Sequence, residues 1–252
     1  MKPVFGHGIF TTDGKLWQHS RALLRPTFMK ESISNLQVTE EHFQHLLKCI
    51  PRDGSTVDLQ TLFFNFTMDT ATQFLFGHSV NTQTQSGFVS GQVSDKEFVE
   101  QYTYTQFQAS HNVRLGPLAR FYYNPKANKA RKTVFKWVDH YIDVALDSLK
   151  SKNGWYSDGE EIAIAKKEYI FLQELAKETT DRVVLRDQVL NVLLAGRDTT
   201  ASLLSNLFFM LARHPEVWKK LRVEVLQLHG RLPNYAELRD MKYLRQCINE
   251  CT

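Results

Sequence analysis

The chain has 252 residues, of which 42% are hydrophobic and 23% are charged. This composition is typical of a globular protein with a sizeable core, and it excludes disordered, collagen-like and low-complexity chains. The three cysteines form no CxxC pair, which argues against a disulfide framework and favours a reducing compartment. The formal net charge of +4 comes from scattered residues, and no nucleic-acid partner is expected.

The densest basic run lies between Lys126 and Lys136. Such a run can bind an acidic partner or a membrane surface, but the solvated face of a helix is the preferred interpretation. No signal peptide or membrane-spanning helix is expected. The apolar stretch Val189–Ala195 is too short to cross a membrane, and Arg197 and Asp198 follow it closely.

In the first part of the chain, apolar residues recur at the helical period and predict a succession of helices. The segment Asp58–Phe76 is apolar nearly all round, which predicts a core helix, and Gly77 stands where a C-cap glycine belongs. The predicted helices are Asp13–Leu24, Ser32–Ile50, Asp58–Phe76, Asp95–Ala109 and Pro125–Leu149. Loops or irregular connections are predicted at Asn81–Gly91, Leu115–Tyr123 and Ser151–Glu160.

After a short helical segment at Phe171–Leu175, the longest predicted helix is Leu185–Ala212. His214-Pro215 interrupts it, and Pro215 suits the first position of the next helix, which Gly230 ends. Asn234 and Glu237 have the spacing of a capping box and predict a last helix running to the chain end. With few strand signals, the sequence predicts a mainly α fold with little or no sheet.

The middle of the longest predicted helix has an unusual composition, Ala-Gly-Arg-Asp-Thr-Thr at Ala195–Thr200. Glycine destabilises a helix interior, threonine can bond back to the carbonyl four residues earlier, and a buried aspartate needs a partner. These choices favour a functional groove, in which a flat ligand approaches the glycine and the hydroxyl and acid groups pass protons. A solvent-facing patch of the helix is the alternative.

Two further features are individually weak. Trp17 and Arg21 lie one turn apart on a predicted helix and could clamp an anion, although for this pair taken alone an ordinary amphipathic helix is the preferred interpretation. Glu250 on the last helix is, by itself, a surface glutamate. His42 and His45 share a helix face, but a solvated surface is preferred to a metal site.

Together, these motifs resemble those of the cytochrome P450 family in their order and spacing. Ala195–Thr200 is similar to the oxygen-pocket motif of the family's long central helix, and Trp17–Arg21 to the short helix that grips a haem propionate. His214-Pro215-Glu216 opens the next helix as in the family, and Asn249–Thr252 resembles the start of its E-x-x-R motif. The sequences around Gly8–Phe10 and Arg25–Phe28 look most like fungal enzymes that hydroxylate long-chain alkanes and fatty acids.

The resemblance implies that residues 1–252 form a single partial P450 domain, from helix C to the start of helix K. The N-terminal anchor, the first sheet and the haem-thiolate loop are expected to be missing, and no metal ligand is assigned because the cysteine thiolate is absent. Trp17 and Arg21 would bind a propionate of haem b. Ala195 and Gly196 would line its distal face.

The remaining roles also follow from the resemblance. Asp198 and Thr199 would deliver protons to iron-bound dioxygen, and Glu250 would pair with the arginine of the E-x-x-R motif. Aromatic residues of the Asp95–Ala109 helix are candidates for the substrate pocket, with core packing as the alternative: Tyr102, Tyr104 and Phe107.

The whole enzyme would insert one oxygen atom from O2 into an apolar long-chain substrate, an n-alkane or a fatty acid. It would take electrons from an NADPH–cytochrome reductase at the cytoplasmic face of the endoplasmic reticulum membrane. The chain by itself is expected to be inactive and marginally stable. The alternative is a non-catalytic, haem-free helical remnant. A di-iron helical oxygenase is disfavoured, because it needs Glu-x-x-His pairs and the sequence has none.

Overall fold

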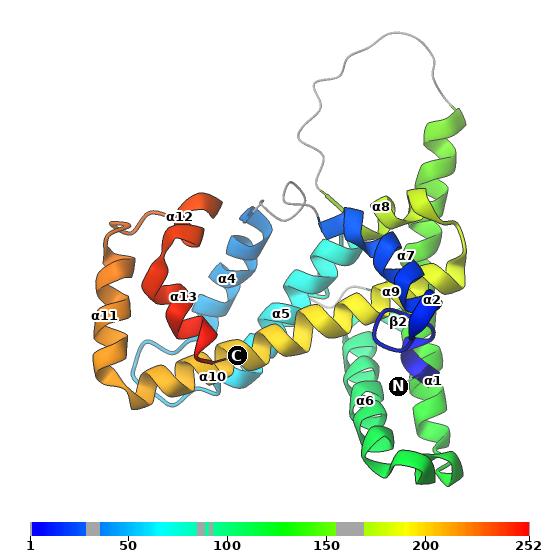
Figure 1. Ribbon diagram of the computed structural model, residues 1–252, viewed down its shortest axis with the longest axis horizontal. Coiled ribbons are helices and arrows are strands. Elements are labelled where there is room, and N and C mark those ends of the chain that lie inside the picture. The colour runs from blue at the N-terminus through cyan, green and yellow to red at the C-terminus, as the bar shows by residue number, and fades with distance from the viewer. Residues whose placement is uncertain (1, 29–35, 85–88, 91–92, 155–168, 252) are drawn as a thin grey trace.

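One long helical rod runs through the fold and carries the Ala195–Thr200 motif. The computed structural model describes residues 2–28, 36–84, 89–90, 93–154 and 169–251. The rod consists of α9 (Arg182–Leu194), the π-helical segment η3 (Ala195–Thr199) and α10 (Thr200–Arg213). Figure 1 shows it running from α2, α7 and α8 towards α11. The predicted long helix is therefore confirmed, with a local change of helical type at the motif.

The rod begins three residues earlier than predicted because Asp181 caps it. The Asp181 carboxylate accepts hydrogen bonds from Val183 N at 2.8 Å and Val184 N at 3.3 Å. Such a cap satisfies amide groups that have no partner within the helix.

The described residues of the N-terminal part form these elements: α1 (Lys2–Phe5), α2 (Gly14–Leu24), the 3-10 helix η1 (Arg25–Phe28), α4 (Gln37–Cys49) and α5 (Leu59–Phe76). Asp58 caps α5, and Gly77 ends it in the left-handed conformation with φ 68°, as predicted. Helix α5 packs against both α4 and α10, and the prediction that it is a core helix is confirmed. The predicted start of the preceding helix at Ser32 lies outside the described residues.

A two-stranded ribbon connects α5 to the next helices. Strands β1 (Val89–Ser90) and β2 (Val93–Ser94) are antiparallel, with Val89 opposite Ser94. Residues 89–90 were predicted to be loop, and this prediction was wrong. The ribbon is the only sheet among the described residues, so the expected mainly α class with little or no sheet is confirmed.

Helices α6 (Asp95–Leu115) and α7 (Pro125–Gly154), joined by the 3-10 helix η2 (Gly116–Phe121), form an arm that projects from the molecule (Figure 1). The prediction that the first helix ends at Ala109 was wrong. It continues through a polar turn until Gly116, whose φ of 56° ends it. The loop predicted from Ser151 also begins too early, because α7 extends to Gly154.

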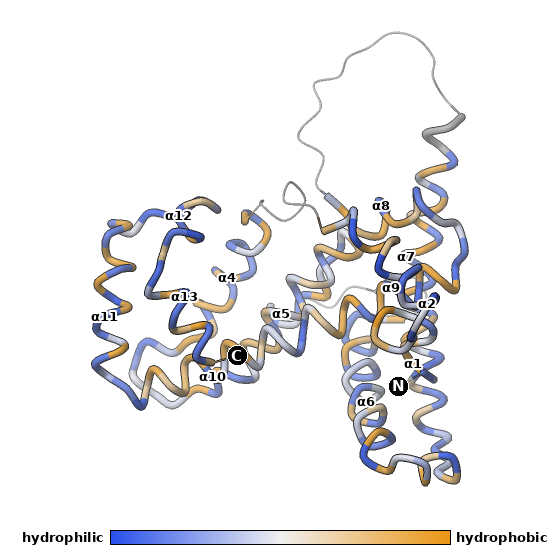
Figure 2. The backbone as a smooth tube through the Cα atoms, viewed as in Figure 1, coloured by the Kyte–Doolittle hydropathy of each residue, from blue (hydrophilic) through white to orange (hydrophobic). Residues whose placement is uncertain are grey.

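The C-terminal helices form a smaller cluster at the far end of the rod. After the short α8 (Phe171–Glu178) that precedes α9, the helices are α11 (Pro215–Leu226), α12 (Tyr235–Asp240) and α13 (Lys242–Asn249). The capping box is confirmed, but the chain breaks at Met241 instead of forming one continuous helix. Glu224 of α11 takes over the capping there, since its carboxylate accepts from Tyr243 N and Leu244 N. Figure 2 shows polar and apolar residues interleaved along α11.

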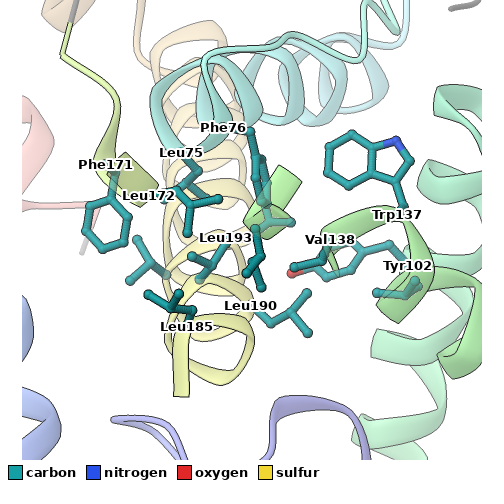
Figure 3. Close-up of a cluster of buried hydrophobic side chains, with 14 of the residues drawn as sticks. Leu75, Phe76, Tyr102, Trp137, Val138, Phe171, Leu172, Leu185, Leu190 and Leu193 are labelled. Atoms are coloured by element: carbon teal, nitrogen blue, oxygen red, sulfur yellow. The ribbon is translucent and has the colours of Figure 1, made fainter. Parts of the chain in front are cut away.

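The main core lies where α5, α6, α7, α8 and α9 meet. Figure 3 shows side chains from these helices converging, among them Trp137 and Leu190, both 0% exposed. Trp137 stacks on Phe98 with ring centroids 3.8 Å apart. The Trp137 indole donates to the fully buried Asp95 carboxylate at 2.9 Å, and His78 Nε2 lies 2.8 Å from its other oxygen. This core holds α9, and therefore the motif that follows it, in place.

Candidate functional site

The motif adopts a π-helical turn instead of continuing the α-helix. Within η3, the Thr199 hydroxyl donates to the Ala195 carbonyl at 2.6 Å, as expected for a threonine that bonds back within a helix. Gly196 is exposed, and a Cβ atom there would meet only the Ala71 Cβ at 3.8 Å. Single π turns inside α-helices occur frequently at functional sites.

An apolar cavity of about 520 Å³ borders this turn. Ala195 and Gly196 form part of its wall, together with Phe66 and Phe74 of α5 and Tyr169, which stacks on Phe74. The lining is apolar apart from the hydroxyls of four threonines and Tyr169. Small residues of the rod and aromatic residues of other segments line a space suited to an apolar ligand.

The charged residues of the motif point away from this cavity, towards α6. The Asp198 carboxylate accepts a hydrogen bond from Gln106 Nε2 at 2.8 Å, and Arg197 Nη1 lies 3.4 Å from its other oxygen. The Gln106 carbonyl in turn accepts from Arg197, and Thr103 accepts from the second guanidinium nitrogen at 3.2 Å. Burial raises the pKa of Asp198, although Arg197 and Gln106 act in the opposite direction.

Arg197 is the buried centre of this network. It is only 8% exposed, and its guanidinium lies 5.3 Å from the Phe64 ring centroid and 5.9 Å from that of Tyr102. Aromatic faces on two sides partly replace the water that a buried cation loses. The arginine therefore fixes the orientation of the motif between α5 and α6.

The aromatic residues predicted as pocket candidates have different positions. Tyr102 is 0% exposed and packs in the core, which was the alternative considered for it. Tyr104 lies under Lys126 Nζ, 4.8 Å from its ring centroid. Phe107 is 66% exposed. None of the three lines the cavity at Gly196.

Trp17 and Arg21 lie together on α2, one turn apart as predicted. The guanidinium carbon of Arg21 is 5.4 Å from the centroid of the Trp17 ring, and both side chains are exposed. Between them, Ser20 is buried and accepts a hydrogen bond from Gln188 of α9 at 2.8 Å. Gln188 precedes Ala195 by seven residues, about 10 Å along a helix. The pair is thus anchored beside the rod but does not line the cavity.

Glu250 lies away from these groups. It is exposed at the end of α13 and borders a separate hollow with Cys247 and Cys251. The structure therefore divides the predicted site residues into three groups: the rod, α2 and the end of α13.

Sequence reasoning missed Gln106 and Thr103, which hold the motif from α6. No local pattern identifies them, because their partners lie more than ninety positions later in the chain. The expectation of a solvated surface was wrong for His42, which is 7% exposed and whose pKa is lowered by burial. Among the described residues, no group of three or more His, Cys, Asp or Glu side chains could hold a metal ion.

Comparison with known sequences identifies the family of this chain. The sequence profile of cytochrome P450 matches residues 1–251. The chain belongs to the cytochrome P450 family.

Several similar proteins come from fungi. The chain is 44% identical over 256 residues to the cytochrome P450 monooxygenase fsdH of Fusarium heterosporum and 45% identical over 253 residues to himC of Aspergillus japonicus. It is 40% identical over 264 residues to cytochrome P450 52A10 of Candida maltosa. Each alignment covers 99% of this chain but only 44%, 44% and 49% of the relative. The chain thus spans about half the length of these relatives.

None of the described helices is both long and apolar enough to cross a bilayer.

Proposed function

We propose that the whole protein is a haem-thiolate monooxygenase that inserts one oxygen atom from O2 into an apolar long-chain substrate, an n-alkane or a fatty acid. The observation that carries this proposal is the π turn Ala195–Thr199, which presents two small residues to an apolar cavity of about 520 Å³. The same turn contains an acid, Asp198, and a hydroxyl, Thr199, which follow Gly196 after one intervening residue, Arg197. This combination is suited to chemistry on an apolar ligand that also needs protons.

The residues present are compatible with a haem at this turn. Gly196 leaves its side of the helix open, and Ala195 adds only a methyl group, so a flat ring can approach the backbone. Ala195 and Gly196 would contact the ring, while Trp17 and Arg21 would bind a propionate from α2, which Ser20 anchors to the rod. The haem would supply the activation of dioxygen.

Asp198 and Thr199 are proposed to hold and move protons. Burial raises the pKa of Asp198, so its carboxyl retains a proton at a higher pH than an exposed aspartate does. The Thr199 hydroxyl is exposed and donates to the Ala195 carbonyl, so it can exchange that bond for one to a ligand. The two groups have different hydrogen-bond partners, and we propose that a bridging water carries protons between them.

Turnover by the whole protein tests this function. The protein is supplied with haem, NADPH, an NADPH–cytochrome reductase and either an n-alkane or a fatty acid, under isotopically labelled dioxygen. The expected product carries one labelled oxygen atom, detected by mass spectrometry. Thr199→Val should lower product yield relative to NADPH consumption, while the exposed Thr61→Val of α5 should not. A whole protein that takes up no haem would favour the alternative, a non-catalytic helical remnant.

We also propose that the whole protein works at the cytoplasmic face of the endoplasmic reticulum membrane, and the arm formed by α6 and α7 supports a membrane contact. Residues 101–138 contain seven Lys and Arg side chains and no Asp or Glu. At the tip of the arm, Phe121 is 84% exposed and Tyr123 is 78% exposed. Exposed aromatic residues with basic neighbours suit an anionic lipid surface.

Vesicle flotation tests this contact. The chain should float with vesicles containing phosphatidylserine, and Phe121→Ser should release it, whereas Phe107→Ser on the shaft of the arm should not. Equal binding of both variants would contradict the proposal.

A further inference from the structure

A short N-terminal segment, Phe5–Phe10, is fastened to the rod by two buried polar side chains. Asp187 is 5% exposed and Asn191 is 0% exposed, although both lie on α9, whose neighbouring residues form the main core. The Asp187 carboxylate accepts a hydrogen bond from His7 N at 2.8 Å. A buried carboxylate and a buried amide are unfavourable unless they are bonded, so these contacts account for their presence in the core.

Asn191 uses both ends of its side-chain amide. Its nitrogen donates to the Phe5 carbonyl at 2.8 Å and to the Asp187 carbonyl at 2.7 Å. Its oxygen accepts from Phe10 N at 3.0 Å. Both amide protons and the oxygen are therefore engaged, and two of the three bonds hold the ends of the segment.

The glycines of the segment make this close approach possible. A Cβ atom on Gly8 would lie 2.1 Å from Asn191 Nδ2, yet the φ angle of Gly8 is one that other residues adopt. At Gly8, therefore, it is the Asn191 side chain and not the backbone that requires glycine. Gly6 differs, because a Cβ atom there would lie 2.0 Å from Asp187 Oδ2 and its φ is +52° as well.

The fastening point lies next to the site. Asn191 precedes Ala195 by four residues, one turn of the helix, so both occupy the same side of the rod. We propose that Asp187 and Asn191 are positioning residues that seat Phe5–Phe10 beside the ligand site at Ala195. That a ligand binds there rests on the proposed function, whereas the fastening of the segment does not.

Hydrogen exchange of the 252-residue chain tests the fastening through a double-mutant cycle. Asn191→Ala should speed exchange of the Phe10 amide about tenfold, the effect of losing one buried hydrogen bond. Gly8→Ala alone should do the same, because its methyl group displaces the amide of Asn191. In the double variant, Gly8→Ala should add less than about twofold, because the clash no longer exists.

Gln188→Ala is the matched control. Gln188 is buried on the same helix and makes one bond of 2.8 Å, but to Ser20 and not to the segment. The substitution Gln188→Ala should leave the hydrogen-exchange rate of the Phe10 amide unchanged. If Asn191→Ala does not fold, Asn191→Ser replaces it, since the shorter hydroxyl also relieves the clash with residue 8. Additive effects of the two substitutions, or a Phe10 amide that is unprotected in the unsubstituted chain, would overturn the proposal.

Ligand binding tests the positioning role. The probe is a fluorescent long-chain fatty acid titrated into the same variants. Asn191→Ala should weaken its binding about tenfold, while Gln60→Ala, an exposed substitution at the start of α5, should not. Equal affinities of the unsubstituted chain and Asn191→Ala would overturn the positioning role. Absence of binding to the unsubstituted chain would instead contradict the proposed substrate class, and the exchange cycle would then decide the fastening independently.

Discussion

Gln106 and Asp198 are joined by a 2.8 Å hydrogen bond although ninety-two positions separate them in the chain. The same glutamine accepts from Arg197, so one amide serves both charged residues of the π turn. This contact connects α6, one of the two helices of the projecting arm, to the turn at which we propose that protons are transferred.

Gln106→Ala is expected to raise the pKa of Asp198 further. Burial already raises it, and the substitution removes a donor that favours the ionised carboxylate. Carboxyl-carbon NMR should show the titration of Asp198 moving to higher pH. Gln60→Ala, an exposed substitution on α5, should leave it in place. An unchanged titration in Gln106→Ala would show that the hydrogen bond does not control the protonation of Asp198.

The buried carboxylate of Asp95 is expected to contribute strongly to stability. Asp95→Ala leaves the indole of Trp137 and the ring of His78 without this acceptor in the core, at a cost of about 3 kcal/mol. Urea unfolding followed by circular dichroism measures the change in the free energy of unfolding.

Two controls define this effect. Trp137→Phe keeps an aromatic ring against Phe98 and should cost less than Asp95→Ala, while the exposed Asp147→Ala should change stability by less than about 0.5 kcal/mol. Equal stability of Asp95→Ala and Asp147→Ala would be inconsistent with a structural role for Asp95.

Asp187 should make stability depend on pH. Burial raises its folded-state pKa above the ordinary value, with the His7 amide and Arg186 opposing the shift and Asp181 adding to it. The folded chain then holds the proton more tightly than the unfolded chain does. The stabilisation is complete below the unfolded-state pKa of about 3.9 and is lost as the pH rises through the raised pKa.

Asp187→Asn should remove this contribution, because its amide oxygen can accept from His7 without ionising. Urea midpoints measured from about pH 4 upwards should fall more for the unsubstituted chain than for Asp187→Asn. Parallel pH profiles would contradict the assignment of this dependence to Asp187.

Gly77 is expected to tolerate alanine poorly for two separable reasons. Its φ of +68° is a left-handed conformation, which costs an alanine about 1 kcal/mol, and an added Cβ would lie 2.5 Å from Ile170 Cδ1. Gly54 also has a positive φ, +80°, but faces open space. Gly54→Ala should therefore lower the free energy of unfolding only by the cost of the left-handed backbone conformation. Equal losses of unfolding free energy in the two variants would mean that Ile170 moves aside freely.

The sequence by itself determined the features that depend on nearby residues. The capping box of Asn234 and Glu237, the C-cap at Gly77 and the back-bond from Thr199 to Ala195 each join residues no more than four positions apart. Their geometry follows from helical spacing, so a motif of a few letters is sufficient to predict them. For the same reason, the helices were predictable even where their ends were misplaced.

Only the tertiary structure decided which helix faces are covered and which distant side chains meet. It buries His42, directs Asp198 to Gln106, and places Asn191 where Gly8 can have no side chain. These contacts join segments about ninety or more positions apart or depend on neighbouring helices. Helical periodicity indicates where a polar side chain lies on a helix, but it does not identify the residue to which that side chain bonds. The packing of the segments determines the partner, because a buried polar group in the rod is stable only where another segment supplies its hydrogen bond.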